Sequence, residues 1–203
     1  KVMNKLDVWQ VETLEDLPLR ADDKWYTLLA VAGQKKASWL MLKSDVWREG
    51  EEPIRIPEDQ IRRMKASLEK LGLSSRLRFR DTDAGVLQTN DELPGRRRYN
   101  QICDIFVGIT DVDAQELFNA VEKMDHPGIG YALGYPNTAV SVFGSENAVF
   151  TEDLPEHPFP DIEKYVYFAL SKQHYADELA VVQKWYDVVV ENSKIISVEL
   201  DRL

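Results

Sequence analysis

Hydrophobic residues recur at the spacing of an α-helix in three segments of the chain. In residues 57–72 they follow one another at steps of three, four and three, between an initial proline and a final glycine. The segment from Thr110 to Met124 and the segment from Lys172 to Val189 have the same kind of apolar stripe, and Thr110 is a suitable N-terminal cap. The pattern predicts three amphipathic helices.

Other segments have the pattern of β-strands. Residues 25–31 and 37–42 are rich in strand-forming residues and flank a turn, so they predict an antiparallel hairpin. In residues 76–80 arginines alternate with Leu77 and Phe79, which predicts a half-buried strand with its arginine row facing water. Residues 102–109 are apolar on nearly both faces, as expected of a central strand. A last short strand is predicted at residues 194–200. Residues 165–170 fit either a strand or the start of a helix, and the strand is the preferred interpretation.

The order of these elements predicts an α+β fold in which helices pack on one face of a mainly antiparallel sheet. No composition shift or linker divides the chain, and its length suits one core, so residues 1–203 are interpreted as a single domain. Residues 1–24 are expected to form an arm that packs onto the body through its apolar side chains.

The segment 126–143 concentrates glycines, a proline and apolar residues, and it predicts a helical corner. Gly134 can adopt the left-handed conformation that ends one helix, and Pro136 can start the next. The spacing also resembles a helix-turn-helix motif, which would make the chain a nucleic-acid-binding regulator. Its second helix would offer Asn, Thr and Ser but no Arg or Lys for phosphate or guanine, so a corner packed in the core is the preferred interpretation.

A family resemblance rests on the same segment. The stretch HPGIGYALGYP, from His126 to Pro136, resembles the H-x-x-G-x-x-L-G-Y-P segment of small bacterial families of unknown function. The chain has one extra residue between His126 and Gly130. Because those families have no assigned activity, the resemblance implies no catalytic residue.

Charge is distributed unevenly along the chain. Residues 1–98 contain 19 Lys and Arg against 17 Asp and Glu, whereas residues 99–203 contain 6 against 18. This acidic C-terminal half disfavours nucleic acid as a partner and would attract a basic protein. The main alternative is that the excess of acids serves solubility.

Cysteine use and hydropathy restrict the compartment. Cys103 is the only cysteine, so the sequence offers no internal disulfide and no multi-cysteine metal site, and a buried, inert thiol is expected. No apolar run approaches the roughly 18 residues of a membrane-spanning helix. The expected location is the cytoplasm, with no membrane contact.

Catalytic chemistry has few candidates in the sequence. The strongest is His126 beside Asp125, which would act as an acid/base pair, although no nucleophile motif accompanies it. His157 and His174 are the other histidines, and no two histidines have the spacing of helical metal ligands. No metal and no cofactor are therefore predicted, and the interpretation favours a protein that is not an enzyme.

Arginines form the one basic surface that the sequence suggests. These candidate binding residues come from the predicted arginine strand and from the loop that follows it: Arg76, Arg78, Arg80, Arg96, Arg97 and Arg98. The leading functional prediction is a non-enzymatic module that binds another macromolecule, most simply a protein. The alternatives are the helix-turn-helix-like regulator and an enzyme that uses His126.

Overall fold

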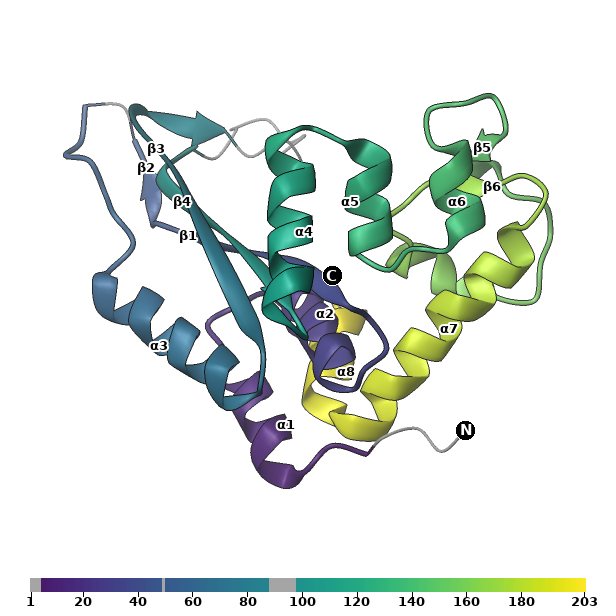
Figure 1. Cartoon of the computed structure of the whole chain (residues 1–203), viewed down its shortest axis with the longest axis horizontal. Helices are drawn as coiled ribbons and strands as arrows, with labels where there is room; N and C mark the ends of the chain where they lie inside the picture. The colour runs from purple at the N-terminus through teal and green to yellow at the C-terminus, as the bar shows by residue number, and fades with distance from the viewer. Residues whose placement is uncertain (1–4, 49, 88–97) are drawn as a thin grey trace.

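The computed structural model describes residues 5–48, 50–87 and 98–203, and it confirms the α+β class (Figure 1). The α-helices are α1 (Val8–Glu15), α2 (Ala21–Val31), α3 (Glu58–Lys70), α4 (Asp111–Glu122), α5 (His126–Ala132), α6 (Asn137–Val142), α7 (Tyr175–Asn192) and α8 (Lys194–Asp201). The strands are β1 (Ala37–Lys43), β2 (Val46–Trp47), β3 (Ser74–Leu87), β4 (Arg98–Gly108), β5 (Ala148–Val149) and β6 (Leu170–Ser171), and two short 3₁₀ helices are η1 (Thr151–Asp153) and η2 (Pro160–Tyr165).

Strand β4 is the centre of the main sheet. It pairs antiparallel with β1 and β2 on one side and with β3 on the other. Ile105 of β4 lies opposite Leu40 of β1 and Leu77 of β3, so the three strands bring apolar side chains together at one level. The central position predicted for residues 102–109 is thereby confirmed.

Helices cover both faces of this sheet, whereas the sequence placed them on one. Successive strand residues point to opposite faces. On one face Leu40, Ile105 and Val107 belong to the main core, to which α2, α3, α7 and α8 also contribute. On the other face Phe106 packs with α4 and α5 around a smaller core that includes Leu117. Figure 1 shows α4 crossing in front of the sheet beside α5.

Three predicted strands are helical or largely irregular. Residues 25–31 lie in α2, where Trp25, Leu28 and Leu29 are fully buried at helical spacing. Residues 194–200 form α8, which Ser193 caps by accepting a hydrogen bond from the Ile196 N–H. Residues 165–170 contain the end of η2 and the first residue of a two-residue strand. In α2 and α8, tertiary burial outweighs the local strand preference of the side chains.

The predicted helical corner is present. Helices α5 and α6 meet at Gly134, whose φ of 73° places it in the left-handed region, and Pro136 directly precedes α6. A Cβ at Gly130 would lie 2.8 Å from Cγ2 of Val140, so only glycine allows the two helices this close approach. The corner holds Tyr135 against the body of the protein, where this ring packs on both core clusters.

Within the described ranges, no helix has the length and apolar character that crossing a membrane requires.

Candidate functional site

Lys35 lies in the connection between α2 and β1, and it is almost entirely buried. Helix α2 ends in a left-handed turn at Gly33, with φ of 68°, and the Lys35 N–H donates to the carbonyl oxygen of Leu29 at 3.3 Å. Gly134 of the helical corner approaches the Lys35 backbone, since a Cβ there would lie 3.9 Å from the Lys35 Cα. The turn and the corner together hold the lysine inside the protein, with 3% of its surface exposed.

The Lys35 side chain ends among three aromatic rings. Its Nζ is 4.3 Å from the ring centroid of Tyr26, 4.8 Å from that of Tyr135 and 4.7 Å from that of Trp185. These residues come from α2, from the helical corner and from α7, so the tertiary fold assembles the cage. Among the residues that the structure describes, none offers Nζ a carboxylate partner or a hydrogen-bond acceptor.

Two physical effects act in opposite directions on the charge of this amine. Burial lowers the pKa of Lys35 to about 7 from an ordinary value of 10.5. The faces of the three rings favour the ammonium form, together by about 2 kcal/mol. Near neutral pH the lysine therefore loses its proton readily, and the free amine that results is nucleophilic.

A cavity of about 370 Å³ opens beside the caged lysine. Its wall combines aromatic and aliphatic surface with charged groups from α2, from β1, from β3 and from the helical corner: Asp23, Tyr26, Lys35, Trp39, Met41, Arg78, Arg80, Leu133 and Tyr135. Elsewhere in the described chain, Arg76 Nε is the only buried side-chain nitrogen or oxygen with no hydrogen-bond partner. Lys35 is one of the residues that line this cavity, so the cavity gives a small molecule a route to the buried lysine.

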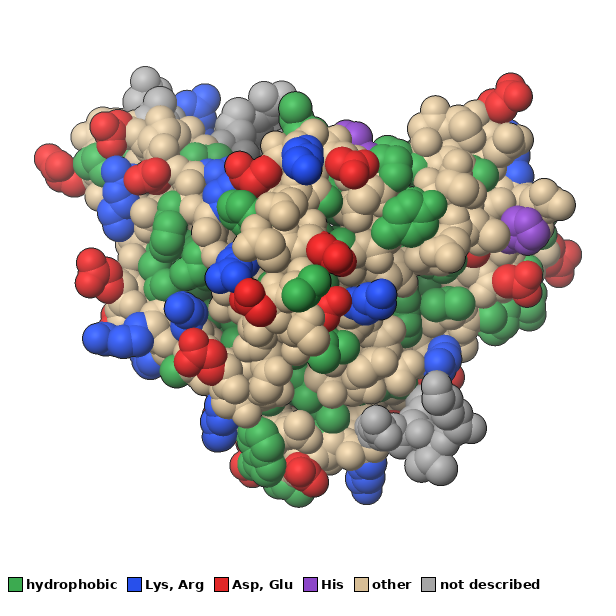
Figure 2. All heavy atoms as spheres, in the orientation of Figure 1, with side chains coloured by type: hydrophobic (Ala, Val, Ile, Leu, Met, Phe, Trp, Pro, Cys, Tyr) green, Lys and Arg blue, Asp and Glu red, His purple; other side chains and the backbone are tan. Residues whose placement is uncertain are grey.

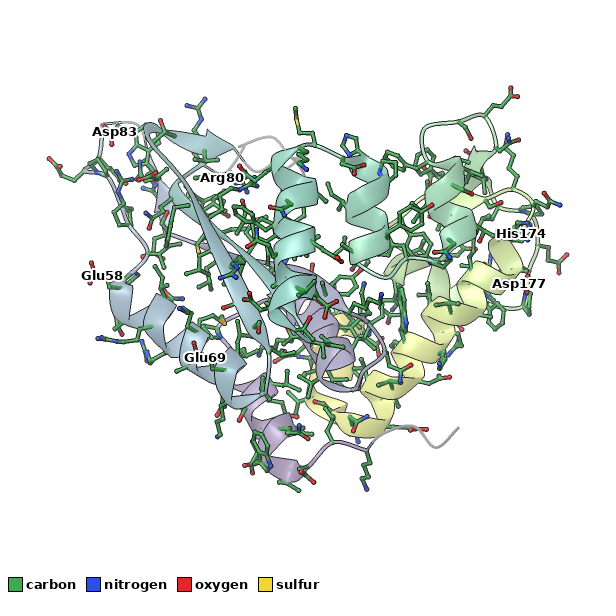
Figure 3. The ribbon with its side chains drawn as sticks, in the orientation of Figure 1. Glu58, Glu69, Arg80, Asp83, His174 and Asp177 are labelled. Atoms are coloured by element: carbon green, nitrogen blue, oxygen red, sulfur yellow. The ribbon has the colours of Figure 1, made fainter. Side chains whose placement is uncertain are left out.

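The two arginines of the cavity are fixed on one buried carboxylate. Asp104 of β4 has no exposed surface, and its Oδ2 accepts from Arg78 Nη2 and Arg80 Nε, each at 2.8 Å. Arg80 Nη2 and Trp39 Nε1 donate to Oδ1 at 3.0 and 3.2 Å. Charge-assisted pairs with this geometry hold both guanidinium groups in place. In Figure 3 Arg80 lies on the side of β3 that faces α4.

Arg80 retains donor capacity toward the cavity. Its Nε and Nη2 bind Asp104, whereas its Nη1 makes no hydrogen bond within the described residues. Arg78 is more fully used, since its Nη1 donates to Glu122 of α4 at 2.8 Å. An anion in the cavity can thus be held by Arg80 without breaking the contacts that position it.

Asp23 supplies an acidic group to the same cavity. Its Oδ2 accepts from the Met41 N–H of β1 at 3.3 Å, which gives one backbone donor of this sheet edge a partner. Burial, foremost, and the neighbouring Asp22 carboxylate together raise the pKa of Asp23 to about 7. No ion pair joins Asp23 to Lys35 in the described part of the chain, so each is available to a ligand. A carboxyl group that titrates near neutrality can donate or accept a proton.

The predicted arginine row does not face water. Arg78 and Arg80 have 26% and 36% of their side chains exposed and point toward Asp104, while Phe79 between them is 44% exposed. The period of the strand was assigned correctly, and Leu77 faces the main core, but the arginine face binds the buried carboxylate of Asp104 and is not open to water. Arg76 binds Asp111 at the helix start, 2.6 Å away.

Arg98, the remaining arginine candidate within the described residues, is not part of the cavity wall. Arg98 begins β4, opposite Trp47 and Leu87, and Arg96 and Arg97 lie outside the described residues. Figure 2 shows Lys and Arg side chains interspersed with Asp and Glu side chains over the α4 face.

The histidine candidates also lie away from the cavity. His126 is exposed at the start of α5, with its ring centroid 5.6 Å from that of Phe143. Asp125 caps α5 by accepting from the Gly128 N–H at 3.0 Å, so its carboxylate serves the helix end rather than the imidazole. His174 precedes α7, at the far side of the molecule from Arg80 in Figure 3.

His157 has a structural role that the sequence did not suggest. Its Nδ1 accepts from the Phe159 N–H at 3.1 Å, and its Nε2 is 2.7 Å from Glu163 Oε1. Because Nδ1 accepts, Nε2 carries the proton and donates it to the glutamate. This arrangement closes the proline-rich loop before η2.

A second cluster lies between η2, α7 and α8. Tyr165 and Tyr186 stack with ring centroids 4.9 Å apart, and both hydroxyls donate to the Asp201 carboxylate. These hydrogen bonds, that from Tyr165 foremost, lower the pKa of Asp201. The hollow beside them measures about 720 Å³, but its carboxylate is 44% exposed and already occupied, so the cluster holds α8 in place.

Cys103 is buried on the face of the sheet opposite the cavity, and burial raises the pKa of its thiol to about 12. No group of three or more His, Cys, Asp or Glu side chains that could hold a metal ion occurs in the described segments.

The sequence identified Arg78 and Arg80 as binding candidates but not Lys35, Asp23 or the three rings. Lys35 and Lys36 appear in the sequence as an ordinary polar turn. Only the contact between this turn and the helical corner buries the first lysine and leaves the second exposed. The only indication of this site in the sequence was the presence of aromatic residues near the turn and near the helical corner.

No protein-family model matches the chain, and no curated protein or solved structure shows significant similarity to it.

Proposed function

We propose that the protein binds a small organic anion in the cavity beside Lys35. The observation that carries this proposal is that one cavity joins two arginines fixed on Asp104 with a buried amine that has no acidic partner in the described chain. A bound anion would supply the missing negative charge, and it would accept from the free nitrogen of Arg80.

The dimensions of the cavity favour a small ligand. A volume of about 370 Å³ lies near the lower end of the usual range for small-molecule sites, which is roughly 300 to 1,000 Å³. The rings of Tyr26, Trp39 and Tyr135 offer apolar contact for a short carbon chain. The net charge of −10 for the whole chain opposes large polyanions at long range, whereas a small anion meets mainly the local field of the cavity.

Macromolecule binding, the leading prediction from sequence, stays a prediction. The helix-turn-helix alternative loses one of its polar groups, because the Thr138 hydroxyl donates to the buried Glu178 carboxylate at 2.5 Å. An enzyme that uses His126 would need a carboxylate or another polar group to orient its exposed imidazole. The neighbouring carboxylate of Asp125 instead caps α5.

A binding titration tests the proposed function. Ligand-observed NMR with short monocarboxylates, dicarboxylates and phosphate esters should reveal binding to the wild-type protein. Lys35→Met should weaken that binding by about tenfold or more, since it removes the only unpaired cation of the cavity wall. Lys36→Met changes the exposed neighbour of Lys35 and serves as the matched control, for which we expect unchanged affinity. Absence of binding by all compounds, or equal affinity in both variants, would refute the proposal.

A further inference from the structure

The environment of Lys35 differs from that of a lysine held only for stability. Structural lysines that are buried are paired with an acid, whereas this amine is surrounded by the faces of Tyr26, Tyr135 and Trp185 and meets no acid in the described residues. Lys35 also lines a cavity. Two of the features that turn a lysine into a nucleophile are therefore present, namely desolvation of the amine and a path for the substrate.

We propose that Lys35 forms an imine with an oxo acid, a small carboxylic acid that also carries an aldehyde or ketone group, when this acid is bound in the cavity between β1, β3 and the helical corner. This inference rests on the proposed function, because the ligand must first bind as an anion. The amine selects the carbonyl group, and Arg80 with Arg78 selects the carboxylate.

The charge of the site favours a carboxylate over a phosphate group. Arg78 and Arg80 contribute two positive charges, and Asp104 and Glu122 contribute two negative charges, so protonated Lys35 remains as the one net positive charge when Asp23 is neutral. A monoanion balances that charge, whereas a phosphate ester would leave an excess negative charge in a half-buried site.

The reaction is balanced without an oxidant or a reductant. The Nζ lone pair attacks the carbonyl carbon, the carbonyl electrons move to oxygen, and transfer of a proton from nitrogen to oxygen gives a carbinolamine. A second proton added to the hydroxyl lets it leave as water while the nitrogen lone pair forms the C=N bond. Amine and carbonyl thus give imine and water. Asp23, on the wall of the same cavity, supplies the proton for the departing hydroxyl and recovers one from nitrogen.

Reductive trapping tests this inference. The full-length protein is incubated with sodium cyanoborohydride and either pyruvate or levulinate, two oxo acids of different length, and the adducts are located by peptide mass spectrometry. Hydride from the reagent converts the imine into a stable secondary amine. We expect a single adduct on Lys35, formed at least about tenfold faster than on any exposed lysine, because far more of this amine is unprotonated near neutrality.

Variants and matched compounds make the result specific. Lys35→Met should abolish the adduct and Lys36→Met should leave it unchanged. Acetone, which has the carbonyl group without the carboxylate, should label Lys35 much more slowly than pyruvate, and propionate should compete with pyruvate.

Two outcomes distinguish imine formation from the proposed anion binding on which it rests. If the oxo acids bind in the NMR titration but adducts spread over exposed lysines and persist in Lys35→Met, the imine is refuted and anion binding stands. If neither acid binds and no Lys35 adduct forms, both proposals fail. Labelling by acetone as fast as by pyruvate would refute the selection of an acid.

Discussion

The Nζ of Lys35 lies 4.8 Å from the centre of the Tyr135 ring, which joins the turn after α2 to the helical corner of α5 and α6. These two segments are about a hundred residues apart in the sequence, and each closes one side of the same cavity. The glycine and proline residues of the corner thus have a scaffolding role, and the residue that they position contributes to the candidate site.

The stability of the protein should depend on Lys35 in a pH-dependent way. The pKa of Lys35 is about 7 in the folded chain against 10.5 ordinarily, so between these values the unfolded chain binds a proton that the folded chain lacks. The contribution of Lys35 to the free energy of unfolding is therefore lowest below pH about 7, and it increases as the pH rises toward 10.5. Lys35→Met should raise the free energy of unfolding by about 2 kcal/mol at neutral pH, allowing for the lost cation–π contact. Urea denaturation across pH measures this, and a gain that does not shrink at alkaline pH would contradict it.

The Tyr135 ring should hold the lysine pKa up. Tyr135→Leu removes one ring face from the ammonium, and we expect the pKa of Lys35 to fall by about half a unit, equivalent to a cation–π contact of about 0.7 kcal/mol. Tyr135→Phe keeps the face and should leave the pKa nearly unchanged. The pH dependence of the Lys35 reaction rate with an acylating reagent gives both values, and an equal fall in both variants would show that the ring face is not the cause.

Asp104 should be the most sensitive carboxylate of the site. Asp104→Asn leaves two half-buried guanidinium groups without their shared counter-charge, so we expect a loss of about 3 kcal/mol in the free energy of unfolding. Asp111→Asn breaks the exposed pair with Arg76 and should cost less than about 0.5 kcal/mol. Chemical denaturation of both variants checks this, and similar losses would mean that the Asp104 contacts contribute no more than a surface pair.

Asp23 should produce the opposite pH dependence to that of ordinary surface acids. Its pKa is raised from 3.8 to about 7, so the folded chain keeps a proton that the unfolded chain loses as pH rises through this interval. Stability should therefore fall across that window, and Asp23→Asn should remove the fall, with a gain of about 2 kcal/mol above neutrality. Thermal unfolding of wild type and variant over this range measures it. A constant difference between them would show that Asp23 does not titrate there.

Periodicity gave correct predictions where local pattern and tertiary burial agree. Helix α3 has one apolar face and strand β4 has two, and both patterns are visible in the sequence. The positions of these two elements could therefore be predicted from the sequence. Residues 25–31 failed because large β-forming side chains such as Trp25 are also well accommodated on a helix once the core buries them. Where the apolar pattern fits both a helix and a strand, the secondary structure depends on the elements that pack against the segment. A single sequence does not reveal these elements.

The candidate site was less predictable than the fold. Arg78 and Arg80 were recognisable as a pair of cations, but their orientation depends on Asp104, which the sequence shows only as one polar residue in an apolar strand. The low pKa of Lys35 results from its burial by the helical corner, which lies far along the chain. Desolvation and long-range contacts create such a site, and neither is a property of local sequence.

Competitive labelling with a trace of acetic anhydride, followed residue by residue with mass spectrometry as pH is varied, tests the central claim most directly. If the Lys35 amine opens to the cavity and holds its proton weakly, its reactivity should reach half of its maximum at pH about 7. A midpoint at the ordinary lysine value of 10.5, or no labelling until the protein unfolds, would contradict the account.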